Sequence, residues 1–212
     1  MKIKIGIIDL NVGNIFSVIK AFKKLNVTFE VINNRKKIDE CTHIVLPGVS
    51  SFKTAIENLI KLNLKEKIIE NHKSGKPILG LCVGCQLLMD YSKEGGMHKG
   101  IGIIKGSVDI LPKIIDNKKI KLPHVGWQSL IKKKQSENTI LHNIISNEDN
   151  VYFTHSYKCN PEEKKNILAT FDFYGIEEPA VIYENNSIGI QFHPELSGNV
   201  GKKILNNFIS KF

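Results

Sequence analysis

The chain has 212 residues, of which 42% are hydrophobic and 24% charged, so it can enclose an apolar core in one domain or at most two small ones. This composition excludes collagen-like, coiled-coil and disordered chains. No apolar run reaches the roughly 18 to 20 residues of a membrane helix, and the apolar start soon meets Asp9, so we expect neither a membrane span nor a signal peptide. We therefore expect a cytoplasmic protein whose four cysteines stay thiols.

The charge balance is basic, because 30 lysines and arginines outnumber 21 acidic residues and give a net charge of +9. Arg35 is the only arginine, and the lysines are scattered apart from short clusters such as residues 132–134. Nucleic-acid recognition favours arginine. We therefore expect a solvated lysine-rich surface and no nucleic-acid role, although a basic patch could also meet an acidic protein or an anionic substrate.

The first half of the chain alternates short apolar runs with segments of helical periodicity. The runs predict strands over residues 3–8, 27–32, 43–46 and 77–81. Helices are predicted between them, over residues 15–25 and 56–68, and after the last strand around residues 87–88. This alternation favours right-handed crossovers and a parallel, doubly wound sheet with helices on both sides.

The second half changes to short strands separated by turn residues. Strands are predicted over residues 106–111, 121–125, 151–154, 167–173, 180–183 and 187–192, and an amphipathic helix over residues 200–209. The predicted fold is therefore α/β, with a doubly wound, mostly parallel sheet flanked by helices and a partly antiparallel C-terminal half. Because no linker, repeat or low-complexity tract interrupts the chain, we expect one domain over residues 1–212.

The strongest local signal is Gly80-Leu81-Cys82-Val83-Gly84, between a predicted strand and a helical segment. This is the pattern of a nucleophile elbow, where a strained turn requires small residues two positions before and after the nucleophile. The positive end of the following helix would favour the thiolate. The alternative is that Cys82 is a small buried residue at a tight turn.

Cys82 and Cys85 also form a Cys-x-x-Cys motif. A zinc site would need two more ligands at metal spacing, and the sequence has no second cysteine pair and no close histidine pair, so we expect no metal. A redox dithiol at the start of a helix stays open as an alternative.

His193-Pro194-Glu195 follows the last predicted strand. A thiol nucleophile needs a base, and an imidazole serves best when a carboxylate fixes its tautomer. Residues at i and i+2 of an extended segment point the same way, so Glu195 can lie beside His193. Backbone amides of residues 46–51, together with that of Val83, could form an oxyanion hole, although an ordinary strand-to-helix loop is the alternative reading.

Five segments together resemble the class I (triad) glutamine amidotransferases over essentially the whole chain. They are GLCVGCQ (residues 80–86), PGVSSF (47–52), PHVGWQ (123–128), YFTHSY (152–157) and GIQFHPE (189–195). PHVGWQ and YFTHSY are typical of the branch that serves histidine biosynthesis, in which a glutaminase subunit forms a heterodimer with a (β/α)8-barrel cyclase and passes ammonia to it.

The resemblance implies a role for each matching residue. Cys82 would attack the glutamine carboxamide, His193 would act as base and then as acid, and Glu195 would orient His193; no cofactor is implied. The remaining matches fall into three groups: glutamine binding (Gln86, His155, Ser156 and Tyr157), the oxyanion region (Gly48, Val49 and Val83), and the surface facing the cyclase (Asn14, Trp127, Tyr152 and Leu196). For Trp127, a place in the core is the alternative.

Several positions depart from the family pattern. Ser50 stands where a glycine is usual, and Leu196 where a basic residue commonly pairs with an acid of the cyclase. Asp9-Leu10-Asn11, Cys85 and Gln128 also differ. These departures keep one alternative open, a paralogous glutaminase that supplies ammonia for a surface-glycan sugar. A catalytically silent regulatory subunit is an alternative of a different class. The intact Cys82, His193 and Glu195 argue against the silent subunit.

Overall fold

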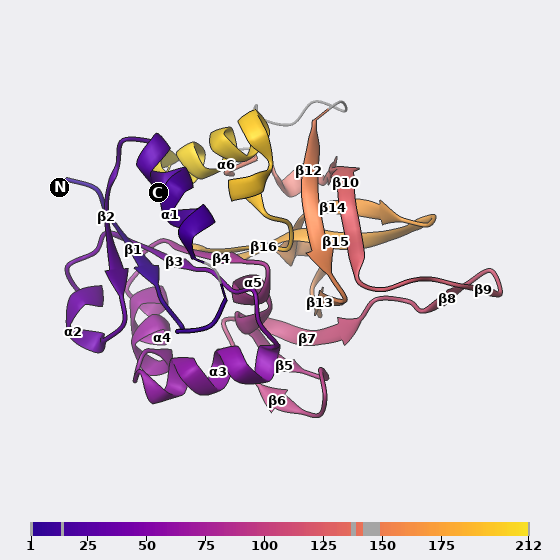
Figure 1. The fold of residues 1–212 in the computed structure, drawn as a ribbon, viewed down its shortest axis with the longest axis horizontal. Helices are drawn as coiled ribbons and strands as arrows, with labels where there is room; N and C mark the ends of the chain where they lie inside the picture. Colours follow the sequence, from indigo (N-terminus) through magenta and orange to yellow (C-terminus); the bar gives the residue numbers. More distant parts are fainter. Residues whose placement is uncertain (1, 14, 137–138, 142–148, 212) are drawn as a thin grey trace.

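The computed structural model describes residues 2–13, 15–136, 139–141 and 149–211. Its central sheet has eight strands in the order β11-β14-β15-β16-β4-β3-β1-β2 (Figure 1). The parallel part pairs β1 (Lys4–Ile8), β2 (Thr28–Ile32), β3 (His43–Leu46), β4 (Ile78–Leu81) and β16 (Ser187–Ile190). The antiparallel part adds β15 (Ile176–Glu184), β14 (Ile167–Phe173) and β11 (Ile131–Lys132). The predicted fold class is confirmed.

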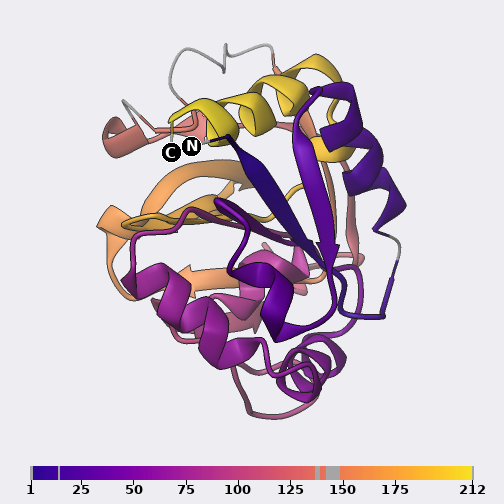
Figure 2. The same ribbon diagram turned by 90° about the vertical axis from the view of Figure 1, so that its left-hand side faces the viewer.

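Side chains that alternate along the strands divide the apolar core between the two faces of this sheet. Ile5 and Ile7 of β1 belong to the core cluster on one face, together with α1 (Phe16–Lys24) and α6 (Gly198–Lys211). Ile8 belongs to the cluster on the other face, with α2 (Arg35–Ile38), α3 (Phe52–Lys61), α4 (Lys65–Lys73) and α5 (Val83–Leu87). Figure 2 shows α1 and α6 on the opposite side of the sheet from α3 and α4.

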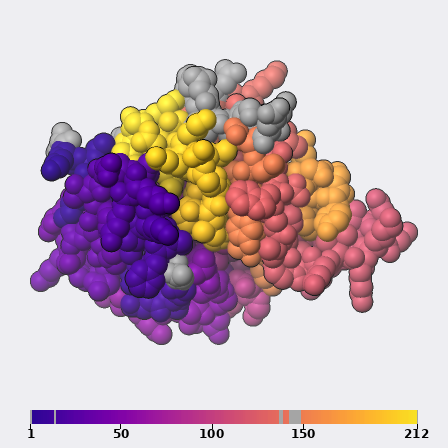
Figure 3. Space-filling view, turned by 45° about the horizontal axis from the view of Figure 1, so that its top comes forward, coloured from indigo at the N-terminus to yellow at the C-terminus, as the bar shows by residue number. Residues whose placement is uncertain are grey.

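Smaller sheets extend the C-terminal half. A four-stranded sheet contains β13 (Tyr157–Pro161), β7 (Ile104–Ile110), β5 (Met89–Ser92) and β6 (His98–Lys99), and a two-stranded sheet pairs β10 (His124–Ser129) with β12 (Asn150–His155). A hairpin of β8 (Ile114–Ile115) and β9 (Lys118–Lys119) projects from the body of the molecule (Figures 1 and 3). Short 3-10 helices are η1 (Lys134–Ser136), η2 (Lys164–Asn166) and η3 (Pro194–Leu196). Within the described chain, no helix has both the length and the apolarity needed to span a membrane.

Several element predictions need correction. The helix predicted over residues 56–68 is split, because Asn63 adopts a left-handed backbone with φ 54° between α3 and α4. The strand predicted over residues 121–125 begins later, at His124, because Pro123 has no N–H to donate to a ladder. The helix around residues 87–88 ends at Leu87, where the chain turns into β5. The sequence predicted neither α2 nor the strands β5, β6, β8, β9, β11 and β13.

Candidate active site

Cys82 lies at the sharp turn between β4 and α5, with φ 51° and ψ −109°. Its N–H donates to the Ile190 carbonyl at 2.8 Å, which anchors the turn to β16. A Cβ atom on Gly80 would lie 2.5 Å from the Gly84 carbonyl oxygen, and one on Gly84 would overlap the Leu46 carbonyl. Because only glycine fits at both positions, the turn has the strained geometry and small flanking residues that the elbow pattern predicts.

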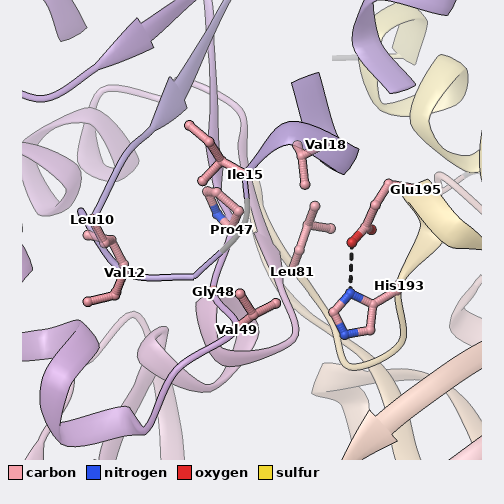
Figure 4. A pocket seen from close by; sticks show the side chains of 10 residues that line it. All are labelled: Leu10, Val12, Ile15, Val18, Pro47, Gly48, Val49, Leu81, His193 and Glu195. Atoms are coloured by element: carbon pink, nitrogen blue, oxygen red, sulfur yellow. Dashed lines mark hydrogen bonds and ion pairs between the residues drawn. The ribbon is translucent and has the colours of Figure 1, made fainter. Parts of the chain in front are cut away.

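His193 and Glu195 follow β16, and both side chains are almost fully buried. The His193 Nδ1–H donates to Glu195 Oε1 at 2.7 Å (Figure 4). The backbone holds His193 in place, because its N–H donates to the Tyr152 carbonyl at 2.8 Å and its carbonyl accepts from Ser197 Oγ at 2.6 Å. Behind the pair is a small cavity of about 10 Å³ whose other lining residues, among them Val18 and Leu81, are apolar.

The charge state of His193 depends on its neighbours. Burial lowers the pKa of His193, but Cys82 and Glu195 outweigh burial and raise the pKa from 6.5 to about 10. Nε2 has no hydrogen-bond partner among the described residues. The free Nε2 can therefore exchange a proton with a reacting group.

The elbow opens into a cavity of about 390 Å³. This volume falls within the range of small-molecule sites. Cys82 and His193 both line the cavity. The four residues expected to bind glutamine line it as well: Gln86, His155, Ser156 and Tyr157. The structure therefore brings together segments from β4, α5, β12, β13 and the end of β16.

His155 supports one wall of this cavity as a neutral ring. Burial lowers the pKa of His155 to about 3. Its Nδ1 lies 2.9 Å from the Tyr157 carbonyl, which can only accept a hydrogen bond, so Nδ1 carries the hydrogen. Gln86 Nε2 donates to the same carbonyl at 2.9 Å. Both side chains therefore fix the backbone of the segment that faces the cavity.

Glu94 is a cavity residue that the sequence did not reveal. Its Oε2 accepts the backbone N–H of Phe52 at 2.7 Å, at the start of α3. Glu94 is the one acidic side chain that lines the cavity within the described chain. It lies in the turn after β5 and is 42 residues from Phe52 in sequence, so no local pattern could predict its position.

The oxyanion region is closed in this structure. The Val83 N–H, which was expected to face the reacting carbonyl, donates instead to the Gly48 carbonyl at 3.3 Å. Val49 and Ser50 line the cavity next to it. The contact is close, because a Cβ on Gly48 would lie 2.8 Å from that of Val83. A rotation of the 48–49 peptide would remove this acceptor and free the Val83 amide.

Two of the residues expected to face a partner, Trp127 and Leu196, are exposed on the surface. Trp127 is 55% exposed, which rules out the core alternative, and its ring centroid lies 5.6 Å from that of Tyr152 across the β10–β12 pair. Leu196, directly after Glu195, is 46% exposed. Asn14 lies outside the described residues.

The cysteine contacts bear on the redox alternative. All four cysteines are free and buried. Cys85 Sγ lies 3.5 Å from Cys159 Sγ on β13. The thiol of Cys85 therefore contacts Cys159, which is not the Cys82–Cys85 pair that a redox dithiol would use. The described part of the chain also contains no cluster of three or more histidine, cysteine or acidic side chains placed to hold a metal ion.

Comparisons with known proteins show what the chain is similar to. Residues 6–212 match the family model described as glutamine amidotransferase class-I. A relative from Caldanaerobacter subterraneus is 47% identical, over 96% of this chain and 96% of the relative. A relative from Geobacillus sp. is 40% identical, over 97% of this chain and 96% of the relative. Both are named "Imidazole glycerol phosphate synthase subunit HisH". Among solved structures, one titled as a glutamine amidotransferase has a TM-score of 0.75 at 13% identity, covering 98% of this chain and 97% of its own. Another, PurLQS from Thermotoga maritima, has a TM-score of 0.75 at 20% identity, covering 99% of both chains. At these identities the two structures support the fold alone.

Proposed function

The chain belongs to the class I glutamine amidotransferases, and from this membership we propose that it is the glutamine-hydrolysing subunit of an imidazole glycerol phosphate synthase. The observation that carries the proposal is the placement of Cys82 at a strained elbow beside the His193–Glu195 pair, on the wall of a cavity of about 390 Å³. The names of two relatives that match over nearly their full length support the choice of this synthase.

The proposed reaction begins when Cys82 Sγ attacks the side-chain carbonyl carbon of glutamine. The proton from the thiol resides on His193 Nε2, which then delivers it to the departing nitrogen, so that ammonia leaves and a γ-glutamyl thioester remains. Water activated by the same nitrogen hydrolyses the thioester to glutamate and restores the thiol. Glu195 accepts the Nδ1–H throughout, which fixes the tautomer and stabilises the imidazolium.

Glutamine recognition is assigned to polar side chains that line the same cavity. The Glu94 carboxylate is suited to the α-ammonium of glutamine, because it is the acidic group among the described cavity residues. Gln86 uses Nε2 for Tyr157 and Gln191, which leaves its carbonyl oxygen to accept from the substrate. Ser156 would supply further polar contacts.

Activation by a partner is supported by the closed oxyanion region. While the Val83 amide is bonded to Gly48, it cannot stabilise the tetrahedral intermediate. Each well-placed oxyanion donor lowers a barrier by about 2.7 to 4 kcal/mol. We therefore expect slow hydrolysis in the isolated chain and faster hydrolysis once a partner shifts the 48–49 peptide.

The proposed partner is a (β/α)8-barrel cyclase that forms a heterodimer with this chain in the cytoplasm, where thiols stay reduced. The exposed Trp127 and Leu196, and Tyr152, which packs against Trp127, would face it, and ammonia would pass directly into the barrel. Asn14 is proposed as a partner-facing residue from the family resemblance alone. We treat residues 1–212 as one amidotransferase domain, since the family match extends from residue 6 to residue 212.

Complementation tests this function. The gene is supplied to a histidine auxotroph that lacks its own glutaminase subunit, together with the cyclase gene of the same organism. Growth without histidine is expected, and Cys82→Ser should abolish it. Absence of growth with both proteins soluble would reject the synthase assignment and favour the surface-glycan alternative.

A further inference from the structure

Gln191 is a buried amide that the proposed reaction does not use. It follows β16, two residues before His193, and is only 1% exposed. Its backbone N–H donates to the Ala180 carbonyl at 2.9 Å, which keeps the residue in register with β15. The side chain lies between Gln86 and the sulfur of Cys82.

The hydrogen bonds determine which end of the Gln191 amide faces the sulfur. The Tyr157 carbonyl can only accept, so the Gln86 group 2.9 Å from it must be the nitrogen. The same Nε2 donates to Gln191 Oε1 at 3.2 Å, which fixes the oxygen end of the second amide. Gln191 Nε2 is therefore the atom that faces Cys82 Sγ, at 3.9 Å.

We propose that Gln191 is a positioning residue for the nucleophile, because its Nε2–H orients the Cys82 sulfur toward the cavity and favours the thiolate over the thiol. The inference rests on the proposed role of Cys82. A thiolate accepts a stronger hydrogen bond than a thiol does, and the effect is larger in a buried, water-poor site. The contact of 3.9 Å is long, so it should tighten when the sulfur gains charge.

Other ionisable groups surround the sulfur and set the background for this effect. They are His193 with its partner Glu195, Cys85 on α5 and, across the cavity, Glu94, His155 and Tyr157. A change at Gln191 leaves all of them in place. A difference between variant and wild type therefore reports the amide.

Two variants separate a positioning role from simple packing. Gln191→Met keeps the length of the side chain and removes both the donor to Cys82 and the acceptor for Gln86. Gln191→Glu keeps the shape and the acceptor for Gln86 but places an oxygen near the sulfur. The matched control is Asn166→Ala, which removes a buried amide beside Tyr183, near the opposite end of β16.

The readout is the rate at which iodoacetamide alkylates Cys82 as a function of pH, followed by peptide mass spectrometry so that the other three cysteines do not interfere. Both Gln191 variants should move the pH midpoint of alkylation upward by about one unit, so that the rate below the midpoint falls about tenfold. Asn166→Ala should leave the midpoint unchanged. With glutamine as substrate, kcat should fall in Gln191→Glu, which keeps the acceptor for Gln86, while KM stays near the wild-type value.

A wild-type midpoint in both folded Gln191 variants would overturn the inference. Alkylation needs neither glutamine nor a partner protein, so it tests Gln191 even if the chain fails to hydrolyse glutamine. Failure of the proposed function would instead appear as absent glutamate release from the wild type, while the alkylation midpoints of the wild type and the Gln191 variants still differ as expected.

Discussion

Replacing Glu195 by glutamine tests the electrostatic core of the site. Glu195 Oε1 accepts the His193 Nδ1–H at 2.7 Å, and both side chains are almost fully buried. Glutamine has the same size and retains a carbonyl oxygen that can accept this hydrogen. The change therefore removes the negative charge with little loss of packing.

The expected loss of folding stability follows from the shift in the pKa of His193. Burial lowers its pKa, yet Cys82 and Glu195 raise it from 6.5 to about 10. At ~1.4 kcal/mol per unit, the net shift corresponds to about 5 kcal/mol. Two neighbours share this stabilisation, so we assign about 2 kcal/mol to Glu195, as for a hydrogen bond between charged groups.

The pH dependence has a definite sign. Because the pKa of His193 is higher in the folded state than in the unfolded state, the stabilisation is fully present below 6.5 and is lost as the pH rises through about 10. In urea titrations, Glu195→Gln should lower the free energy of unfolding by about 2 kcal/mol at about pH 6, and by little at about pH 10.5. Lysines and tyrosines titrate equally in both proteins, so the difference isolates the pair. An equal loss at both pH values would refute the reasoning.

Four further substitutions probe the elbow and the partner surface. Cys82→Ser should reduce glutamate release to background while the melting temperature is retained, whereas Cys85→Ala should keep most activity; equal losses would favour the redox alternative. Gly84→Ala should destabilise the fold by at least about 1 to 3 kcal/mol in chemical denaturation, because its Cβ would overlap the Leu46 carbonyl, and an unchanged midpoint would contradict this geometry. Trp127→Ala should weaken binding to the cyclase by at least about 2 kcal/mol in titration calorimetry, and unchanged affinity would remove Trp127 from the interface.

The sequence predicted the parts of the fold that depend on local pattern. The buried parallel strands are short apolar runs, and β3 was predicted with the bounds that the structure has. The elbow was also predictable. A turn with the strained φ of Cys82 has no space for a Cβ at Gly80 or Gly84, so it requires glycine two positions before and two positions after the cysteine, and this spacing is visible in the sequence.

Other features depend on contacts between distant segments. The strand β13 ends in Asn160-Pro161, which resembles a loop, and forms because β7 offers an antiparallel edge. Glu94 reaches the cavity through a turn that carries no motif. The closed state of the Val83 amide depends on the position of Gly48, more than 30 residues earlier, which no local signal encodes.

Reconstitution with the cyclase tests the central claim most directly. The purified chain and cyclase are supplied with the cyclase substrate and either glutamine or an ammonium salt, and formation of imidazole glycerol phosphate is measured. We predict product from both nitrogen sources with the wild type, and from the ammonium salt only with Cys82→Ser. Product from the ammonium salt but not from glutamine with the wild-type pair would contradict the account.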